Sequence, residues 1–436
     1  MLIQSIKELV EAGKYDKAFY ALYGEKCNID DVRARYTRAI EAFEKLYGGI
    51  VSEKSEIRLF SVPGRTELSG NHTDHNHGKI LAGSVNLDII AVACVAQNNE
   101  IRIKSEGFGQ DIVSLDDVSS VKENEKYKAS AIIRGMCDGF EKNGHKFGGF
   151  YAYTTSNVLK GSGLSSSAAF EVMIGNILNH FYNDGKITSL EIAKIAQYSE
   201  NVHFGKPCGL MDQIACATGG VVSVDFKDPN NPVVEKMSID LEKAGLKLCI
   251  TNTGGNHADL NEDYASVPAD MFSVAKFLGV DFLAQTTKEK LLANASEIRE
   301  KLGDMCFLRA LHFFNENERV QKQKEALENG DLTAFLELVV KSGDSSAKLL
   351  QNVFTVKNVK EQGLSVALAL ASDMLGSIPG TAYRVHGGGF AGTIQSYVPE
   401  KLVKDFTEML ENVFGKGCVY VLNIRKYGAC MLEKIL

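Results

Sequence analysis

The stretch FYAYTTSNVLKGSGLSSSAAFEVMIGNIL, residues 150–178, decides how this sequence is interpreted. Its aromatic and β-branched start predicts a strand, and its apolar end predicts a helix. Between them lies GSGLSSSAA, residues 161–169, a glycine- and serine-rich turn. The first free N–H groups and the positive end of a helix dipole favour an anion at such a place, above all a phosphate. The alternative is a serine-capped helix that follows a flexible turn.

The same turn lacks two better-known phosphate patterns. No GxxxxGK[ST] sequence occurs, so it is not a Walker loop, and the third glycine of a dinucleotide-binding fingerprint is replaced. The three hydroxyls of Ser165, Ser166 and Ser167 remain, and one of them could bind Mg²⁺, which prefers oxygen ligands.

Further elements are predicted on both sides of this stretch. Helical periodicity marks residues 1–48, where 31–48 forms a second segment, and it returns over 288–350. Strands are expected on both sides of the turn, at 57–65, 79–84, 87–96, 221–226 and 246–253. Strands that come early, with helices interspersed later, predict an α+β fold with a domain boundary near residue 230.

Composition restricts the class of protein. A chain of 436 residues with 44% hydrophobic residues predicts two globular domains. The net charge of −7 argues against a nucleic-acid partner, and the ten-residue apolar stretch 87–96 is too short to cross a membrane. The charged N-terminus does not fit a signal peptide, and nine cysteines without close pairs fit reduced thiols. A cytoplasmic protein is expected.

GNHTDHNHG, residues 70–78, places His72, Asp74, His75 and His77 within six positions. Imidazole and carboxylate are zinc ligands, but zinc sites usually show pairs such as HExxH on one helix face. Here glycine and asparagine indicate a loop. A metal site, a surface cluster without a role, and a loop that binds a polar substrate are the three interpretations of these residues.

Two more stretches carry chemical groups. GKPCGLMDQ, residues 205–213, places Asp212 in a turn where a partly desolvated carboxylate could act as a base or ligand, although a helix-capping aspartate would look the same. Glu200 lies twelve residues earlier, at the end of a predicted helix. HGGGFAG, residues 386–392, could bring backbone close to a phosphate or to the first glycine turn.

Taken in order, these stretches resemble the motifs of the GHMP kinases and, within them, of the galactokinases. PGRTELSGNHTDHNHG (63–78) is similar to the galactokinase signature PGRxNLIGEHTDYNxG, GSGLSSSAA to the family's phosphate loop, and RVHGGGFAG (384–392) to its third motif, RMTGGGFGG. GKPCGLMDQ is nearly a verbatim family stretch. The resemblance spans about residues 57–430. It implies a two-domain α+β fold with mixed sheets and an active site in the cleft between the domains, divided as an N-terminal helical extension (1–50), an N-terminal domain (51–230) and a C-terminal domain (231–436).

The resemblance also implies roles for single residues. Asp212 takes the position of the catalytic aspartate that accepts or orients the proton of the C1 hydroxyl, and Arg65 that of the arginine which keeps this carboxylate ionised. The sugar would be bound by Asn71, His72, Asp74, Gly209 and Tyr264. ATP would be bound by Gly161, Ser162, Gly163, Leu164, Ser165, Ser166 and Ser167. Mg²⁺ would be held by Ser167 and Glu200.

The implied activity is phosphorylation of galactose at its anomeric C1 hydroxyl, with ATP and Mg²⁺. The first motif departs from the family at Glu67, Ser69 and Asn71, where the family has Asn, Ile and Glu, and His386 replaces a threonine in the third motif. Because Asn71 alters a sugar contact, the same reaction on arabinose, N-acetylgalactosamine or a uronic acid is an alternative. A sensor of sugar and ATP without turnover is another, although Ser167 and Ala168, which such relatives lose, are retained. The sequence leaves the oligomeric state open.

Overall fold

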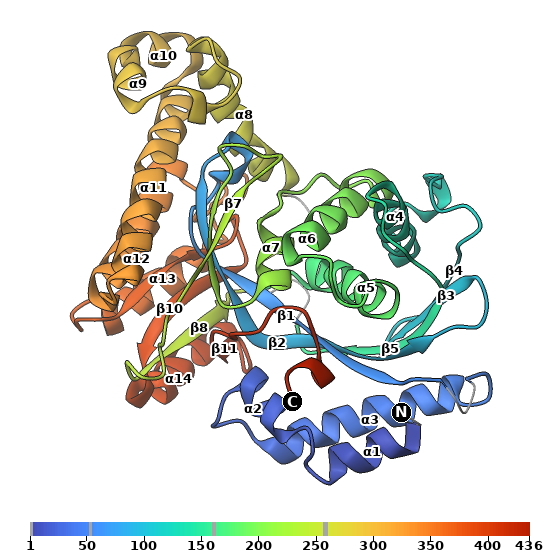
Figure 1. The fold of residues 1–436 in the computed structure, drawn as a ribbon. Helices are drawn as coiled ribbons and strands as arrows, with labels where there is room; N and C mark the ends of the chain where they lie inside the picture. The colour runs from blue at the N-terminus through green and yellow to red at the C-terminus, as the bar shows by residue number, and fades with distance from the viewer. Residues whose placement is uncertain (1–2, 52–54, 159–162, 256–259) are drawn as a thin grey trace.

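The computed structural model describes residues 3–51, 55–158, 163–255 and 260–436 and contains two β-sheets with helices packed against them (Figure 1). The larger sheet has the order β12-β1-β2-β5-β3-β4, with β6 paired to β2 and β7 paired to β6. Among the strands of the described residues, only β3 and β5 pair in parallel. The strands are β1 (Arg58–Ser69), β2 (Lys79–Val95), β3 (Glu100–Ser105), β4 (Gln110–Ser114), β5 (Phe150–Ser156), β6 (Val221–Asp225), β7 (Val233–Met237) and β12 (Cys430–Met431).

Strand β2 is apolar on both faces because helices cover the sheet from both sides. Ile90 and Val92 pack with the three N-terminal helices, whereas the alternate residues Ala91 and Ala93 pack in the core beneath the opposite helices. The N-terminal helices are α1 (Ile3–Glu11), α2 (Asp16–Tyr23) and α3 (Ile29–Tyr47), which lie under the sheet in Figure 1. The helices on the other face are α4 (Ala129–Lys142), α5 (Ser166–Tyr182), α6 (Ser189–Tyr198) and α7 (Met211–Thr218).

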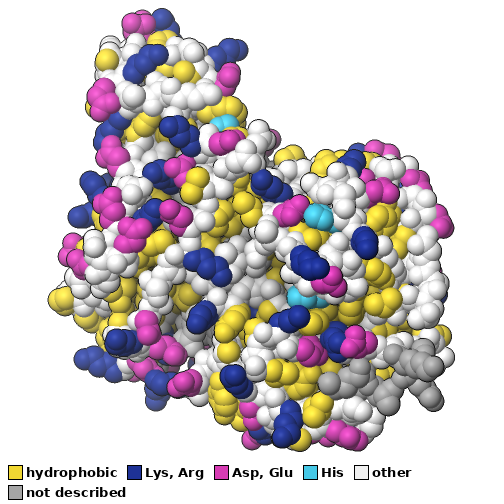
Figure 2. Space-filling model, viewed as in Figure 1, with side chains coloured by type: hydrophobic (Ala, Val, Ile, Leu, Met, Phe, Trp, Pro, Cys, Tyr) yellow, Lys and Arg dark blue, Asp and Glu magenta, His cyan; other side chains and the backbone are white. Residues whose placement is uncertain are grey.

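The smaller sheet is antiparallel, in the order β11-β8-β10-β9. Its strands are β8 (Leu246–Asn252), β9 (Ala382–His386), β10 (Thr393–Pro399) and β11 (Val419–Leu422). The helices of this half are α8 (Asn261–Phe277), α9 (Lys288–Ala293), α10 (Ala295–Leu302), α11 (Asp304–Glu328), α12 (Leu332–Ser345), α13 (Gly363–Leu375) and α14 (Val403–Phe414). The space-filling view shows α9 to α11 as an arm that stands clear of the lobe around α4 (Figure 2), with basic and acidic side chains interspersed over the visible face.

The α+β class agrees with expectation, and three details differ. Residues 79–84 and 87–96 form one long strand, β2, rather than two. Helix α8 was not predicted, because Pro268 inside it breaks the helical pattern. The larger sheet also takes β7 and β12 from beyond residue 230, so a cut at 230 would separate two strands from their sheet.

The N-terminal helices are tied to the larger sheet by Asp88, which is fully buried. Arg35 of α3 forms an ion pair with it at 2.6 Å, Arg425 forms another at 3.1 Å, and the Tyr23 hydroxyl donates to it at 2.7 Å. Burial alone would raise the pKa of Asp88, but the two arginines hold it below its ordinary value. One carboxylate in the larger sheet therefore joins the N-terminal helices to a residue near the end of the chain.

Two observations concern the cysteines and the helices. All nine cysteines are free. Over the residues that the structure describes, no helix is long and apolar enough to cross a bilayer.

Candidate active site

Strand β1 reaches the glycine- and serine-rich turn through an irregularity in its pairing. The register with β2 shifts between Pro63 and Arg65, as it does at a β-bulge, which redirects the following side chain. A Cβ on Gly64 would lie 2.8 Å from the Leu164 carbonyl oxygen, so only glycine allows this approach. The Arg65 N–H then donates to the same carbonyl at 3.1 Å. The bulge thus fixes Arg65 beside the start of α5.

Arg65 and Asp212 form a two-pronged ion pair. The guanidinium Nε and Nη2 donate to the two carboxylate oxygens at 2.7 and 2.8 Å, the bidentate geometry in which such pairs are strongest. Burial acts to raise the pKa of Asp212, but Arg65 and the Ser165 hydroxyl, which also donates to the carboxylate, lower it below its ordinary value. Asp212 lies in the first turn of α7 and is held as an ionised acceptor.

The described part of the glycine- and serine-rich turn begins at Gly163; Gly161 and Ser162 lie outside the described residues. Ser165 precedes α5 in the left-handed conformation, with φ of 55°, which is costly for a residue other than glycine. Its side chain makes no capping hydrogen bond to the helix and bonds Asp212 instead. The first N–H groups of α5, around Ser166 and Ser167, are thereby left for an anion.

A pair of buried carboxylates lies behind this turn. Gln213 donates to Glu171 at 3.0 Å and to Glu200 at 3.2 Å, and one oxygen of Glu171 is buried without a hydrogen-bond partner. Burial and the neighbouring Glu200 raise the pKa of Glu171 well above its ordinary value. Glu200 lies in a π-helical turn, η3 (Ser199–Phe204), a form often found at functional sites. Ser167 lies one helical turn before Glu171 on the same face of α5.

This donor set fits a hard divalent cation. A hydroxyl and two carboxylates are oxygen ligands; Lys206 pairs with Glu200 at 3.3 Å, but one oxygen of Glu171 is buried without a partner. Ser167 and Glu200 were expected at such a site. Glu171 and Gln213 were not, although the four-residue spacing between Ser167 and Glu171 is visible in the sequence.

The loop with the histidines faces the turn that leads to α7. A Cβ on Gly209 would lie 2.3 Å from the Asp74 Oδ2 atom, so the backbone at Gly209 almost touches this carboxylate. Burial raises the pKa of Asp74, while the neighbouring His72 counteracts the rise and Asp212 adds to it. The Asp74 carboxylate therefore lies against Gly209, three residues before Asp212 in the chain.

The third glycine motif turns its carbonyl groups toward the same loop. Asn71 donates to the Gly387 carbonyl at 2.6 Å, and Tyr264 donates to that of Gly389 at 2.9 Å. The His72 Nε2 atom lies 2.9 Å from the carbonyl oxygen of Gly388 and, opposite an oxygen that can only accept, is the donor. Three consecutive carbonyls are thus bound by three residues expected to contact sugar. Joining the glycine run to the histidine loop in this way was not expected from the sequence, which predicted that the run approaches a phosphate or the first glycine turn.

Comparisons with known proteins show which family this chain resembles. A family model described as the GHMP kinases N terminal domain matches residues 131–220, and one described as the galactokinase galactose-binding signature matches residues 41–95. The galactokinase of Streptomyces coelicolor is 30% identical over 379 residues, which cover 86% of this chain and 92% of that protein. The galactokinase of Clostridium acetobutylicum is 30% identical over 400 residues, or 88% and 97% of the two chains. The chain belongs to the galactokinase family.

Solved structures show the same fold. Lactococcus lactis galactokinase complexed with galactose superposes with a TM-score of 0.75 at 23% identity, covering 90% of this chain and 99% of that one. Methanococcus jannaschii mevalonate kinase gives a TM-score of 0.59 at 15% identity, covering 85% and 99%. The two-domain GHMP kinase fold expected from the motifs is confirmed, and as a member of the galactokinase family the protein is a sugar kinase.

Within this galactokinase-family site, the side chain of Asn71 differs most from expectation. Its amide group donates to Glu67 at 3.0 Å and to Gly387, and its oxygen accepts from Asn352 at 2.9 Å and from Ser346 at 3.3 Å. A side-chain amide has two donor hydrogens and two acceptor sites, so all are used within the protein. Asn71 lies in the expected loop but directs no free group toward a sugar.

The histidines of the loop do not converge on a metal. His72 binds Gly388, His75 is nearly buried, and the His77 ring stacks on Phe282 with a centroid distance of 3.7 Å. Burial lowers the pKa of His75 to about 3. Over the described part of the chain, no group of three or more His, Cys, Asp or Glu side chains is arranged to hold a metal ion.

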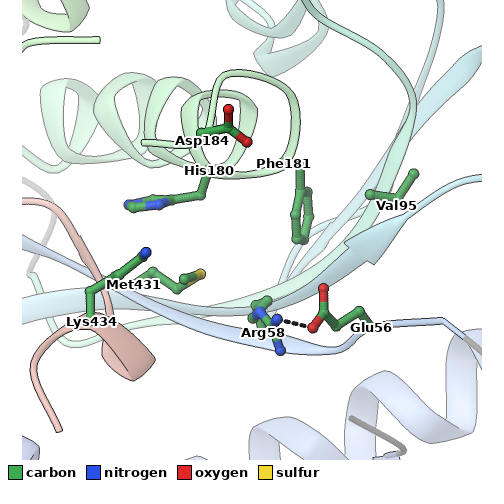
Figure 3. A pocket seen from close by; sticks show the side chains of 8 residues that line it. All are labelled: Glu56, Arg58, Val95, His180, Phe181, Asp184, Met431 and Lys434. Carbon is green, nitrogen blue, oxygen red and sulfur yellow. Dashed lines mark hydrogen bonds and ion pairs between the residues drawn. The ribbon is translucent and has the colours of Figure 1, made fainter. Parts of the chain in front are cut away.

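A cavity of about 360 Å³ lies elsewhere, between the end of α5, the beginning of β1 and the last residues of the chain (Figure 3). Arg58, His180 and Lys434 line it together with Glu56 and Asp184, and Arg58 forms an ion pair with Glu56. None of the residues expected at the active site lines this cavity.

Proposed function

We propose that this protein transfers the γ-phosphoryl group of ATP to the C1 hydroxyl of galactose, giving galactose 1-phosphate and ADP. The observation that carries the proposal is the position of the Arg65–Asp212 pair. It lies between the start of α5, which favours an anion, and the loop with His72 and Asp74, which offers polar groups to a sugar. The galactokinases at 30% identity and the Lactococcus lactis enzyme complexed with galactose support galactose as the substrate.

In the proposed reaction, the C1 hydroxyl oxygen forms a bond to the γ-phosphorus while the bond from that phosphorus to the bridging oxygen of ADP breaks. Asp212 accepts or orients the hydroxyl proton, and ADP leaves with the electron pair. Arg65 keeps the carboxylate ionised and in one orientation through two hydrogen bonds. Transfer of this kind depends on positioning and charge neutralisation more than on covalent catalysis.

The nucleotide phosphates are assigned to the turn from Gly161 to Ser167 and the N-terminus of α5. Ser167 and Glu200 would hold Mg²⁺, with Glu171 and Gln213 beside them. When bound, the metal neutralises charge on the β- and γ-phosphates. The sugar is assigned to His72, Asp74, Gly209 and Tyr264. Asn71 supports these residues through contacts within the protein.

The same reaction on a related sugar is the second candidate, and one observation favours it. The carboxylate that the family places at position 71 is an asparagine here, and the nearby carboxylate of Glu67 is buried against Arg384. The sugar therefore meets one negative charge fewer at this point. Initial rates with ATP and a panel of galactose, arabinose, N-acetylgalactosamine and galacturonate, read as ADP release, distinguish the candidates. No ADP release with any sugar would support the sensor alternative.

Replacing the proposed proton acceptor tests the mechanism. Asp212→Asn keeps the shape of the side chain, so the protein should fold and bind ATP. Its rate should fall by about 10²–10⁴-fold, the contribution usual for acid–base catalysis. A variant with near-normal turnover, prepared free of other kinases, would exclude Asp212 from the proton-transfer step.

A further inference from the structure

Positions 67 and 71 carry the same two chemical groups as the family motif, but in exchanged places. The galactokinase signature has an asparagine and then a glutamate, whereas this chain has Glu67 and then Asn71. The two side chains touch: the Asn71 amide donates to the Glu67 carboxylate at 3.0 Å. Only 5% of Glu67 and 1% of Asn71 are exposed. Two departures that look independent in the sequence are therefore one buried contact.

Each of these two side chains also contacts a residue in the other half of the protein. Glu67 forms an ion pair with the fully buried Arg384 at 3.0 Å, and the same guanidinium donates to the Leu68 carbonyl at 2.9 Å. Asn71 donates to the Gly387 carbonyl at 2.6 Å. Glu67 therefore neutralises the arginine of the third motif, and Asn71 holds the backbone of the glycine run that follows it.

The remaining departures lie in the same buried polar region. The Ser69 hydroxyl donates to Glu316 at 3.0 Å, where the family has an isoleucine that could not do so. The His386 Nε2 atom accepts from the backbone N–H of Glu67 at 3.3 Å, and its Nδ1 atom lies 2.9 Å from the Thr393 hydroxyl oxygen. Because Nε2 accepts, the proton of this neutral imidazole is on Nδ1. Each departure thus has a polar partner in the other half of the molecule.

We infer that Asn71 is a positioning residue, which fixes the glycine run 387–389 against the sugar loop, and that Glu67 is the charge partner that this role requires. Asn71 binds the Gly387 carbonyl, and His72 and Tyr264 bind the next two carbonyls of the run, so Asn71 helps to set the position of those two side chains. A carboxylate at 71 could not donate to Gly387 and would face Glu67. The inference rests on the proposed function only in assigning the sugar to this loop.

Substitutions that exchange oxygen and nitrogen without changing shape test the contact. Asn71→Asp places two carboxylates face to face in a buried site and removes the donor to Gly387, so its urea midpoint should fall clearly. Glu67→Gln keeps an oxygen that can accept from Asn71 but removes the charge that neutralises the buried Arg384, so its urea midpoint should also fall. In the double variant E67Q/N71D the amide and carboxylate again pair, so its midpoint should lie above that of N71D. Asn76→Asp, in the same loop, is the matched control. Adding Glu67→Gln to Asn76→Asp should not raise its urea midpoint.

A kinetic measurement separates positioning from mere stability. The double variant still lacks the donor to Gly387, so its KM for the best sugar should stay about tenfold above that of the unmodified protein, the equivalent of one lost hydrogen bond. The KM for ATP should remain within about twofold, because Asn71 contacts no residue assigned to ATP. Restored stability together with a normal sugar KM would overturn the positioning role.

The urea measurements need no substrate. They therefore test the contact between Glu67 and Asn71 even if no sugar is phosphorylated and the proposed function fails. If Asn71→Asp does not fold, soluble recovery of E67Q/N71D supports the contact. Failure of the double variant to fold while Glu67→Gln folds overturns it, as does a double variant no more stable than N71D.

Discussion

A single methyl group at Gly209 tests whether Asp74 binds the sugar. The added Cβ would lie 2.3 Å from the Asp74 Oδ2 atom, whereas contacts below 3.0 Å are essentially never seen. Gly209 is exposed and its φ is not in the left-handed region, so alanine is compatible with its backbone. The carboxylate must move by about 1 Å, a displacement that can reduce catalytic efficiency by roughly 10²-fold when the group positions a substrate.

Initial rates measured against sugar at saturating ATP, and against ATP at saturating sugar, check this prediction. In Gly209→Ala the sugar KM should rise by about 10-fold or more, the ATP KM should be unchanged, and the melting temperature should shift little. Gly109→Ala is the control, since a Cβ there meets nothing within 4 Å. If Gly209→Ala has the sugar KM of the control, Asp74 does not bind the sugar in the way proposed.

The remaining predictions concern the cation, the histidine loop and acid stability. Glu200→Gln should raise the Mg²⁺ concentration for half-maximal rate by about tenfold or more, and an unchanged Mg²⁺ dependence would leave Glu200 a structural residue. Purified protein should hold far less than one zinc per chain by elemental analysis, since among the described residues no three His, Cys, Asp or Glu side chains are arranged to hold a metal. Burial lowers the pKa of His312 to about 4, so its contribution to stability is full at neutral pH and is lost as pH falls from the unfolded value near 6.5 toward 4. Between pH 7 and 5, His312 alone should lower the free energy of unfolding by about 2 kcal/mol. In urea unfolding, His312→Gln should make the free energy of unfolding depend less on pH over this range. An equally steep loss of stability in the variant would contradict the assignment.

The fold class was predictable because its evidence is local in the sequence. The strand, glycine turn and helix of residues 150–178 follow one another directly, and four motifs in one order indicate the family. The continuous β2 was harder to predict, because a strand covered on both faces loses the alternation that marks a strand with one exposed face.

In the candidate site, too, single residues could be predicted from the sequence, whereas contacts between distant residues could not. Asp212 and Arg65 were singled out by resemblance, but their two-pronged contact joins residues 147 positions apart and needed the structure. Glu171 and Gln213 were overlooked, because a buried carboxylate within an apolar helix has no distinctive pattern until its neighbour Glu200 is placed. The side-chain contacts of Asn71 could not be predicted either, since three of its four partners come from residues 346–387.

The buried Asp88 has a consequence for how the chain folds. Its partners come from residue 23, residue 35 and residue 425, and the larger sheet is completed by β12 at residues 430–431. During synthesis, β1 and β2 therefore emerge long before the arginine and the edge strand that complete their environment. Contacts between residues this far apart slow folding and leave unpaired strand edges exposed in the meantime. The environment of Asp88 and β1 is consequently complete only once residues 425–431 have been added.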